Sequence, residues 1–218
     1  MKLLLTSEGI ANDSIAKALF ELVGKPFTAC RVAYVPTAGY DEPGDKTWIE
    51  MDMDTIRKLK PQSFTIVDIA SEPKNVWLPI FQKSDVIAVG GGNVSFLLQW
   101  LEKSGVKKEL PELLKTRVYI GFSAGSMVTA KIVSLSKEDI ENYQTKGEVN
   151  NKRGLGYVDF QIRPHLNHPD FPRVNTQNLA KLASKISTSF YAIDNDTAIK
   201  VDGDRVTVVS EGEWKKFN

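Results

Sequence analysis

The chain has 218 residues, of which 25% are charged and 42% are hydrophobic, so it can bury one sizeable core. Its 28 basic and 27 acidic residues leave a net charge of +1, which argues against the strong positive field typical of proteins that bind nucleic acid. The apolar start ends at residues 6–8, too soon for a signal peptide, and no later stretch is long enough to cross a membrane. We therefore expect one cytoplasmic domain over residues 1–218.

The chain has one cysteine, Cys30, and cannot form an intrachain disulfide or a cysteine-rich metal site. Because Cys30 begins an apolar run, we expect its side chain to be buried in the ordinary way. The cysteine therefore carries no functional prediction.

Segments typical of strands and of helices alternate through the first half of the chain. Strands are expected at 2–6, 31–35, 63–69, 85–89 and 118–122, and helices at 13–23, 48–59, 75–82, 94–103 and 110–115. Regular alternation predicts an α/β three-layer sandwich, in which helices cover both faces of a mostly parallel central sheet. The ligand crevice of such a sheet lies beyond the carboxyl ends of its strands.

A glycine run, Gly90-Gly91-Gly92, follows one of these strands and leads through Asn93 into a helix. Glycines let backbone N–H groups come close to a ligand, and a helix N-terminus favours negative charge. The loop therefore predicts an anion or oxyanion pocket, to which the side-chain amide of Asn93 can add a hydrogen bond. A phosphate-binding loop is the alternative, but the lysine of a P-loop and the G-x-G-x-x-G spacing are both missing.

The segment 116–130, TRVYIGFSAGSMVTA, carries the strongest catalytic signal in the chain. An apolar strand runs into Gly121-Phe122-Ser123-Ala124-Gly125 and continues as a helix, the context in which a G-x-S-x-G turn presents a serine nucleophile. The pattern is short and also arises by chance in turns, so the strand before it matters. Ser123 is the predicted nucleophile.

A serine nucleophile at neutral pH needs a base, and the chain has two histidines, His165 and His168. They follow a polar segment, 137–152, expected to be a mobile surface excursion, and a predicted strand at 154–162. His165 comes directly after that strand and Pro164, whereas His168 lies in a turn. We therefore favour His165 as the base, with His168 as the alternative.

The last part of the chain predicts a helix at 175–186, a strand at 190–193 and a C-terminal hairpin of 197–201 with 206–209. The hairpin is indicated by the Asp202-Gly203 turn between apolar residues. A polar triplet, Asp194-Asn195-Asp196, separates the strand from the hairpin. The triplet either orients the histidine or is a solvated turn.

Taken in this order, the glycine loop, the serine turn, Pro164-His165 and the segment 193–199 resemble peptidase family S51, the serine peptidases that include dipeptidase E and cyanophycinase. The resemblance covers nearly the whole chain. It implies a flavodoxin-like fold similar to that of the class I glutamine amidotransferases and a Ser-His-acid triad in this chain order. It also implies cleavage next to aspartyl residues without metal or cofactor.

Carried over residue by residue, the resemblance makes Ser123 the nucleophile and His165 the base. The oxyanion hole would consist of the Ala124 N–H and an N–H from Gly91 or Gly92. The third triad position departs from the family, because Asn195 stands where the family commonly has Glu. An amide would then orient the histidine, as in Cys-His-Asn proteases, unless one of the flanking aspartates takes this role.

The sequence thus predicts a serine peptidase that acts on small peptides, with a homodimer left open. Arg173, just after the histidine turn, is the predicted partner of an aspartyl substrate, with a solvated helix-flanking charge as the alternative. The amide at position 195 also motivates a rival hypothesis, a non-catalytic or regulatory binding domain. An esterase acting on small esters would use the same residues.

Overall fold

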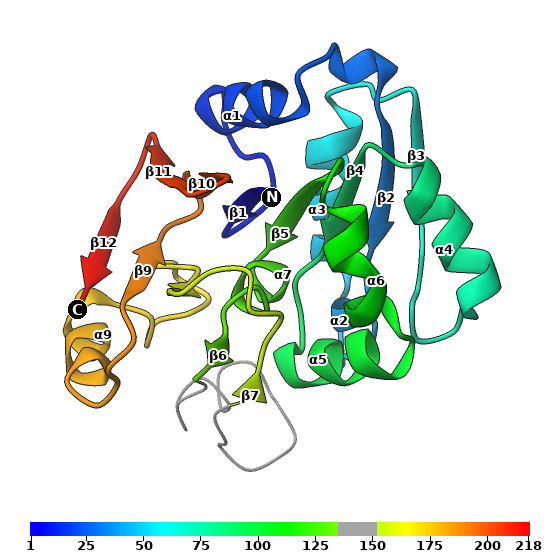
Figure 1. Ribbon diagram of the computed structural model, residues 1–218. Helices are drawn as coiled ribbons and strands as arrows, with labels where there is room; N and C mark the ends of the chain where they lie inside the picture. Colours follow the sequence, from blue (N-terminus) through cyan, green and yellow to red (C-terminus); the bar gives the residue numbers. More distant parts are fainter. Residues whose placement is uncertain (135–151) are drawn as a thin grey trace.

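A seven-stranded sheet forms the centre of the computed structural model, which describes residues 1–134 and 152–218 (Figure 1). The strand order is β11-β10-β1-β5-β4-β2-β3. Strands β1, β5, β4, β2 and β3 pair in parallel, whereas β10 pairs antiparallel with both β1 and β11. The strands are β1 (Lys2–Thr6), β2 (Arg31–Val35), β3 (Ser63–Ile66), β4 (Val86–Val89), β5 (Val118–Phe122), β10 (Thr197–Asp202) and β11 (Arg205–Ser210). The predicted mostly parallel sheet and its hairpin are confirmed.

Helices pack on both faces of this sheet (Figure 1). They are α1 (Asp13–Val23), α2 (Thr37–Tyr40), α3 (Thr47–Arg57), α4 (Lys74–Lys83), α5 (Val94–Lys103), α6 (Val106–Leu113), α7 (Ala124–Met127) and α9 (Thr176–Ala183), with a 3-10 turn at Phe27–Ala29. Side chains alternate along β1, so that Leu3 and Leu5 belong to the core on the face covered by α4, α5 and α6, while Leu4 belongs to the core on the face covered by α1 and α3. The result is the predicted three-layer α/β sandwich.

A second, smaller sheet lies beside the hairpin (Figure 1) and has the order β12-β9-β8. Its strands are β8 (Gln161–Arg163), β9 (Phe190–Ile193) and β12 (Trp214–Phe217), and β8 pairs with β9 in parallel. It has its own apolar core, in which the rings of Phe190 and Phe217 stack 4.8 Å apart. The sequence does not predict β12, because two lysines stand between its end residues and three of its four side chains are exposed.

The predicted strand at 154–162 is wrong, since only its last two residues join a strand, β8. Gly156 has a φ of 75° and turns the chain, and the N–H groups of Leu155 and Tyr157 donate to the carbonyls of Val128 and Thr129 instead of to a strand partner. The residues just before, β7 (Lys152–Arg153), pair with β6 (Ile132–Val133).

The predicted surface excursion at 137–152 lies outside the described residues, apart from Lys152. Within the described ranges, none of the helices combines the length and apolar character that a membrane span requires.

Candidate active site

Ser123 lies at the turn between β5 and α7 with φ 45° and ψ −106°, a backbone conformation that non-glycine residues rarely adopt. The turn is this tight because Gly121 and Gly125 pack on each other, and a Cβ on Gly121 would lie 2.6 Å from the Gly125 carbonyl carbon. The buried Ser126 hydroxyl, 2.7 Å from the Thr6 carbonyl, ties the turn to β1. The helix that follows is shorter than the sequence suggests and ends at Met127.

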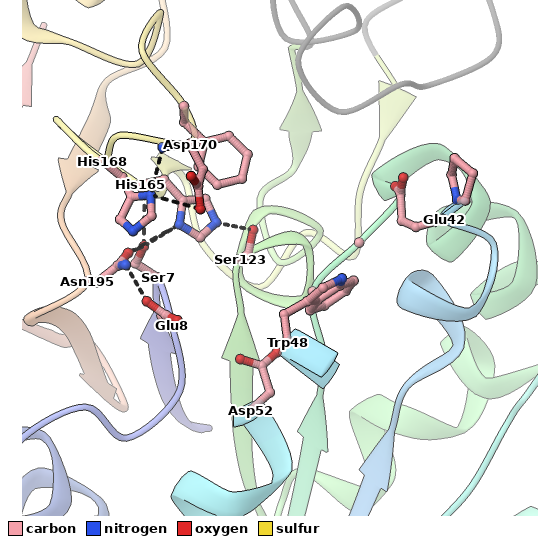
Figure 2. Close-up of a pocket in the computed structure, with 14 residues that line it drawn as sticks. Ser7, Glu8, Glu42, Trp48, Asp52, Ser123, His165, His168, Asp170 and Asn195 are labelled. Carbon is pink, nitrogen blue, oxygen red and sulfur yellow. Dashed lines mark hydrogen bonds and ion pairs between the residues drawn. The ribbon is translucent and has the colours of Figure 1, made fainter. Parts of the chain in front are cut away.

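His165 follows β8 and places its Nε2 2.9 Å from the Ser123 Oγ (Figure 2). Its backbone is also in the left-handed region, with φ 63°, and its N–H donates to the Ser7 Oγ at 2.9 Å. The ring stacks on Phe171 with centroids 4.2 Å apart and is 9% exposed. Burial lowers the pKa of His165 from 6.5 to about 4, against the opposing hydrogen bond from Asn195. The imidazole is therefore neutral at pH 7, as a general base must be.

Asn195 brings its Oδ1 to within 3.2 Å of the His165 Nδ1. The two residues meet because each follows a strand of the small sheet by two positions, and these strands, β8 and β9, are paired in parallel. The Leu166 N–H donates to the Ile193 carbonyl at 3.0 Å and extends the pairing to the site itself. One strand pair thus brings together two residues that lie 30 positions apart in the sequence.

The two flanking aspartates, Asp194 and Asp196, form hydrogen bonds with groups other than His165. The Asp194 carboxylate accepts from the Thr197 hydroxyl at 2.6 Å and from the Asp196 N–H at 3.1 Å, while the Asp196 carbonyl accepts from the Asn12 side chain at 3.0 Å. His168 is likewise turned elsewhere, because its Nδ1 accepts from the Asp170 N–H at 3.2 Å. Of the residues left open by the sequence, His165 and Asn195 are the ones that the structure brings to Ser123.

The predicted oxyanion donors are the N–H groups of Ala124 and of Gly91 or Gly92. Gly91 and Gly92 both line the pocket, and Gly92 has a φ of 119° and so little space that a Cβ would collide with the Ala38 backbone. The Gly91 N–H is directed at the Asp52 carboxylate. The N–H groups of Gly92 and Ala124 have no acceptor among the described hydrogen bonds, so both are available to donate to an oxyanion.

Asn93 and Arg173 are not among the described residues that line the pocket. The Asn93 Oδ1 caps α5 by accepting from the Phe96 N–H at 3.0 Å, and its amide donates to Asp41 at 3.1 Å. Arg173 is exposed, and its carbonyl accepts from the Asn178 side chain at 3.0 Å. Both predicted substrate contacts therefore lie away from the pocket wall.

The cavity in front of Ser123 has a volume of about 300 Å³ and a strongly acidic lining. Four carboxylates face it, and the described lining residues include no lysine or arginine. The carboxylates are those of Glu8, Glu42, Asp52 and Asp170. Burial, followed by the charge of Glu8, raises the pKa of Asp52 to about 8, so Asp52 is largely protonated at pH 7. No group of three or more His, Cys, Asp or Glu in the described ranges could hold a metal ion.

Sequence reasoning missed Ser7, Glu8 and Asp52. Ser7 and Glu8 directly follow β1, and the signal that could have found them is the neighbouring position of β1 and β5 in the sheet, which places both strand ends at one edge. Asp52 gives no such signal, because an acidic residue in the middle of an amphipathic helix normally faces water.

Comparisons with known proteins agree with this architecture. A family model described as peptidase family S51 matches residues 3–209. An uncharacterized peptidase of Listeria monocytogenes, Lmo0363, is 32% identical over 141 residues, covering 64% of this chain and 67% of the relative. Peptidase E of Pasteurella multocida is 24% identical over 195 residues, covering 86% and 78%.

Two solved structures are also similar. The crystal structure of a candidate peptidase E protein from Listeria monocytogenes has a TM-score of 0.78 at 26% identity, covering 97% of this chain and 98% of that one. A peptidase from an acI-B1 actinobacterium has a TM-score of 0.73 at 18% identity, covering 98% and 88%, and supports the fold alone.

Proposed function

The chain belongs to peptidase family S51, and from this premise we propose that it is a serine peptidase that hydrolyses small peptides through Ser123, His165 and Asn195. The observation that carries the proposal is the 2.9 Å contact between the Ser123 Oγ and the His165 Nε2, with Asn195 on the opposite ring nitrogen. Nucleophile, base and orienting group thus stand in line, as acyl transfer requires.

In the proposed reaction, the Ser123 Oγ attacks the carbonyl carbon of the peptide bond while its proton passes to the His165 Nε2. The N–H groups of Gly92 and Ala124 stabilise the oxyanion, and such donors are worth about 2.7–4 kcal/mol each where one has been removed. When the tetrahedral intermediate collapses, the C–N bond breaks and His165 gives its proton to the leaving amine. Water, activated by His165, then hydrolyses the acyl-enzyme and restores Ser123.

The charge of the substrate is the finer part of the proposal. The family resemblance suggests an aspartyl residue on the amino side of the cut bond, which calls for a cationic partner such as Arg173. The described lining instead carries the carboxylates of Glu8, Glu42 and Asp170 beside the largely protonated Asp52, and this favours a substrate that presents a positive charge, such as the free amino group of a small peptide.

Two measurements test the proposal. A fluorophosphonate should label Ser123 in the wild-type protein and fail to label folded Ser123→Ala, and absence of label on the folded wild type would rule out the catalytic site. Tripeptide amides that begin with Asp, Leu or Lys, each with a free or an acetylated amino group, then report on charge. Faster cleavage of the free-amine forms supports recognition of a cation, whereas a preference for Asp returns Arg173 to consideration.

A further inference from the structure

The Asn195 side chain is held on both sides of its amide (Figure 2). Its Oδ1 faces the His165 Nδ1 at 3.2 Å and accepts from the Ser7 Oγ at 2.7 Å. Its Nδ2 donates to the Oε2 of Glu8. A chain of polar contacts therefore runs from Ser123 through His165 and Asn195 to a carboxylate at the end of β1.

Every donor and acceptor in this chain is matched in one arrangement. Ser7 donates its proton to Asn195, so the lone pairs of its Oγ accept from the His165 backbone N–H at 2.9 Å and face the His165 Nδ1 at 3.2 Å. With two oxygens around it, Nδ1 must carry the ring proton. The Nε2 is then unprotonated towards Ser123, which is the tautomer that a general base needs.

The opposite orientation of the amide would disable the base. It would place the Asn195 oxygen against the Glu8 carboxylate, two acceptors without a proton between them, and its NH₂ against Ser7 and His165. The Nδ1 of His165 would have to accept, and the ring proton would move to Nε2, where it blocks proton transfer from Ser123. An amide differs in this respect from the family's usual carboxylate, which has two acceptor oxygens and cannot be placed the wrong way round.

We propose that Glu8 is a positioning residue, whose carboxylate fixes the orientation of the Asn195 amide and through it the catalytic tautomer of His165. The inference rests on the proposed function for its effect on rate, but not for its effect on the tautomer. In this chain a carboxylate stands one contact outward from position 195, at the end of β1. Neither Ser7 nor Glu8 touches the reacting atoms.

The direct test is the tautomer of His165, measured by ¹⁵N NMR of the ring nitrogens at pH 7 with His168→Gln used to assign the signals. Wild type should show a protonated Nδ1 and an unprotonated Nε2. Glu8→Met, which removes the acceptor at similar length, should give a mixture of both tautomers. Glu42→Gln is the matched control, because it removes a carboxylate of the same cavity that has no contact with Asn195, and should leave the tautomer unchanged.

The kinetic test uses the same variants. Outer partners of metal-binding histidines are typically worth about 10- to 100-fold, and by analogy kcat of Glu8→Met should fall by that factor, while its KM should change no more than that of Glu42→Gln, which removes another carboxylate of the cavity. Should Glu8→Met not fold, Glu8→Gln answers the same question, because an amide at position 8 can present either its oxygen or its NH₂ and holds Asn195 less firmly.

Exchanging the amide and the carboxylate between positions 195 and 8 distinguishes a positioning role of Glu8 from a purely structural one. Asn195→Asp alone places two carboxylates against each other and should lower kcat. Combined with Glu8→Gln, whose NH₂ can donate to the new carboxylate, it should recover most of the wild-type rate.

Three results would overturn the inference: one tautomer in both Glu8→Met and Glu8→Gln, an unchanged kcat, or additive losses in the double variant. If Ser123 in the folded wild type takes no fluorophosphonate label, the proposed function fails, and the NMR result alone decides the role of Glu8.

Discussion

Ser123 and its partners come from two different sheets. The serine follows β5 in the middle of the seven-stranded sheet, where its turn is shaped by glycines within two residues and by hydrogen bonds from the Ser123 N–H and the Ser126 hydroxyl to the Thr6 carbonyl of β1. His165 and Asn195 follow β8 and β9 of the three-stranded sheet, and each reaches the site by tertiary pairing. The nucleophile is thus set by local sequence, whereas the base is set by contacts between distant segments.

The difference has an energetic consequence. The large sheet is buried between two layers of helices, while the small sheet has a core of six buried residues, three of them in its own strands, and contributes only Ile162 and Ile193 to the core of the large sheet. Small cores supply little stability, so we expect the base side of the site to be the weaker half.

The largest loss should come from removing either member of the Ser123–His165 pair. Ser123→Ala and His165→Ala should each lower kcat by up to about a million-fold, and the double variant should be hardly worse, because triad members act as a unit. The measurement is kcat on a small peptide, with thermal melting as the control for folding. Losses that multiply in the double variant would show that the two residues act independently.

Truncation of a side chain in the core of the small sheet should destabilise that sheet and leave the large sheet stable. Phe217→Ala removes a ring that stacks on Phe190 and should destabilise the small sheet by about 3–5 kcal/mol. Amide exchange should then accelerate in β9 and β12 while β1 and β5 stay protected, and activity should be lost before global unfolding. Phe81→Ala, in the core of the large sheet, is the control and should lower the stability of the whole chain instead. Uniform exchange in both variants would contradict the contrast.

The same contrast explains what the sequence could predict. The parallel sheet and the Ser123 turn depend on hydrophobic periodicity and on short motifs. Both are local features, so they can be recognised in the sequence alone. The choice of His165 over His168 also followed from local position. Glu8 and Asp52 could not be found in this way, because each acquires its role from a partner more than 40 residues away in the chain.

The wrong strand prediction has the same origin. The apolar residues of 154–162 fit a strand in isolation, but backbone N–H groups of this segment donate to carbonyls just after α7 instead of to a neighbouring strand. The expected substrate contact of Asn93 stays a prediction, and the position after three glycines that suggested it also makes Asn93 the cap of α5. Tertiary alternatives of this kind leave no trace in hydrophobic periodicity.

On the nucleophile side, Asp52 should make stability depend on pH. Its pKa of about 8 in the folded protein lies above 3.8, so folding favours the protonated form, and this contribution is present below pH 4 and is lost as pH rises through 8. Asp52→Asn should therefore stabilise the protein relative to wild type by several kcal/mol at pH 9 and by about 2 kcal/mol at pH 5. Denaturant unfolding at both pH values measures the difference. Equal effects at the two pH values would show that Asp52 does not titrate in this range.

The smallest effect concerns the base and is a shift in pH dependence rather than a loss. Burial holds the pKa of His165 near 4, and part of that burial is the stacked ring of Phe171. Phe171→Ala should admit water and raise this pKa toward 6.5, which moves the acid limb of kcat/KM upward and changes the rate at pH 7 only a few-fold.

His168→Gln is the control, because it removes the neighbouring ring 6.2 Å away and leaves the stacked face covered, so the limb should hardly move. The direction of the His165 pKa shift also predicts how the stability of the fold depends on pH. Because the folded pKa lies below 6.5, wild type should lose stability as pH falls from about 6.5 toward 4, and Phe171→Ala should lose less over that interval. An acid limb that stays near 4 in Phe171→Ala would mean that the small sheet, and not the stacked ring, keeps water from the base.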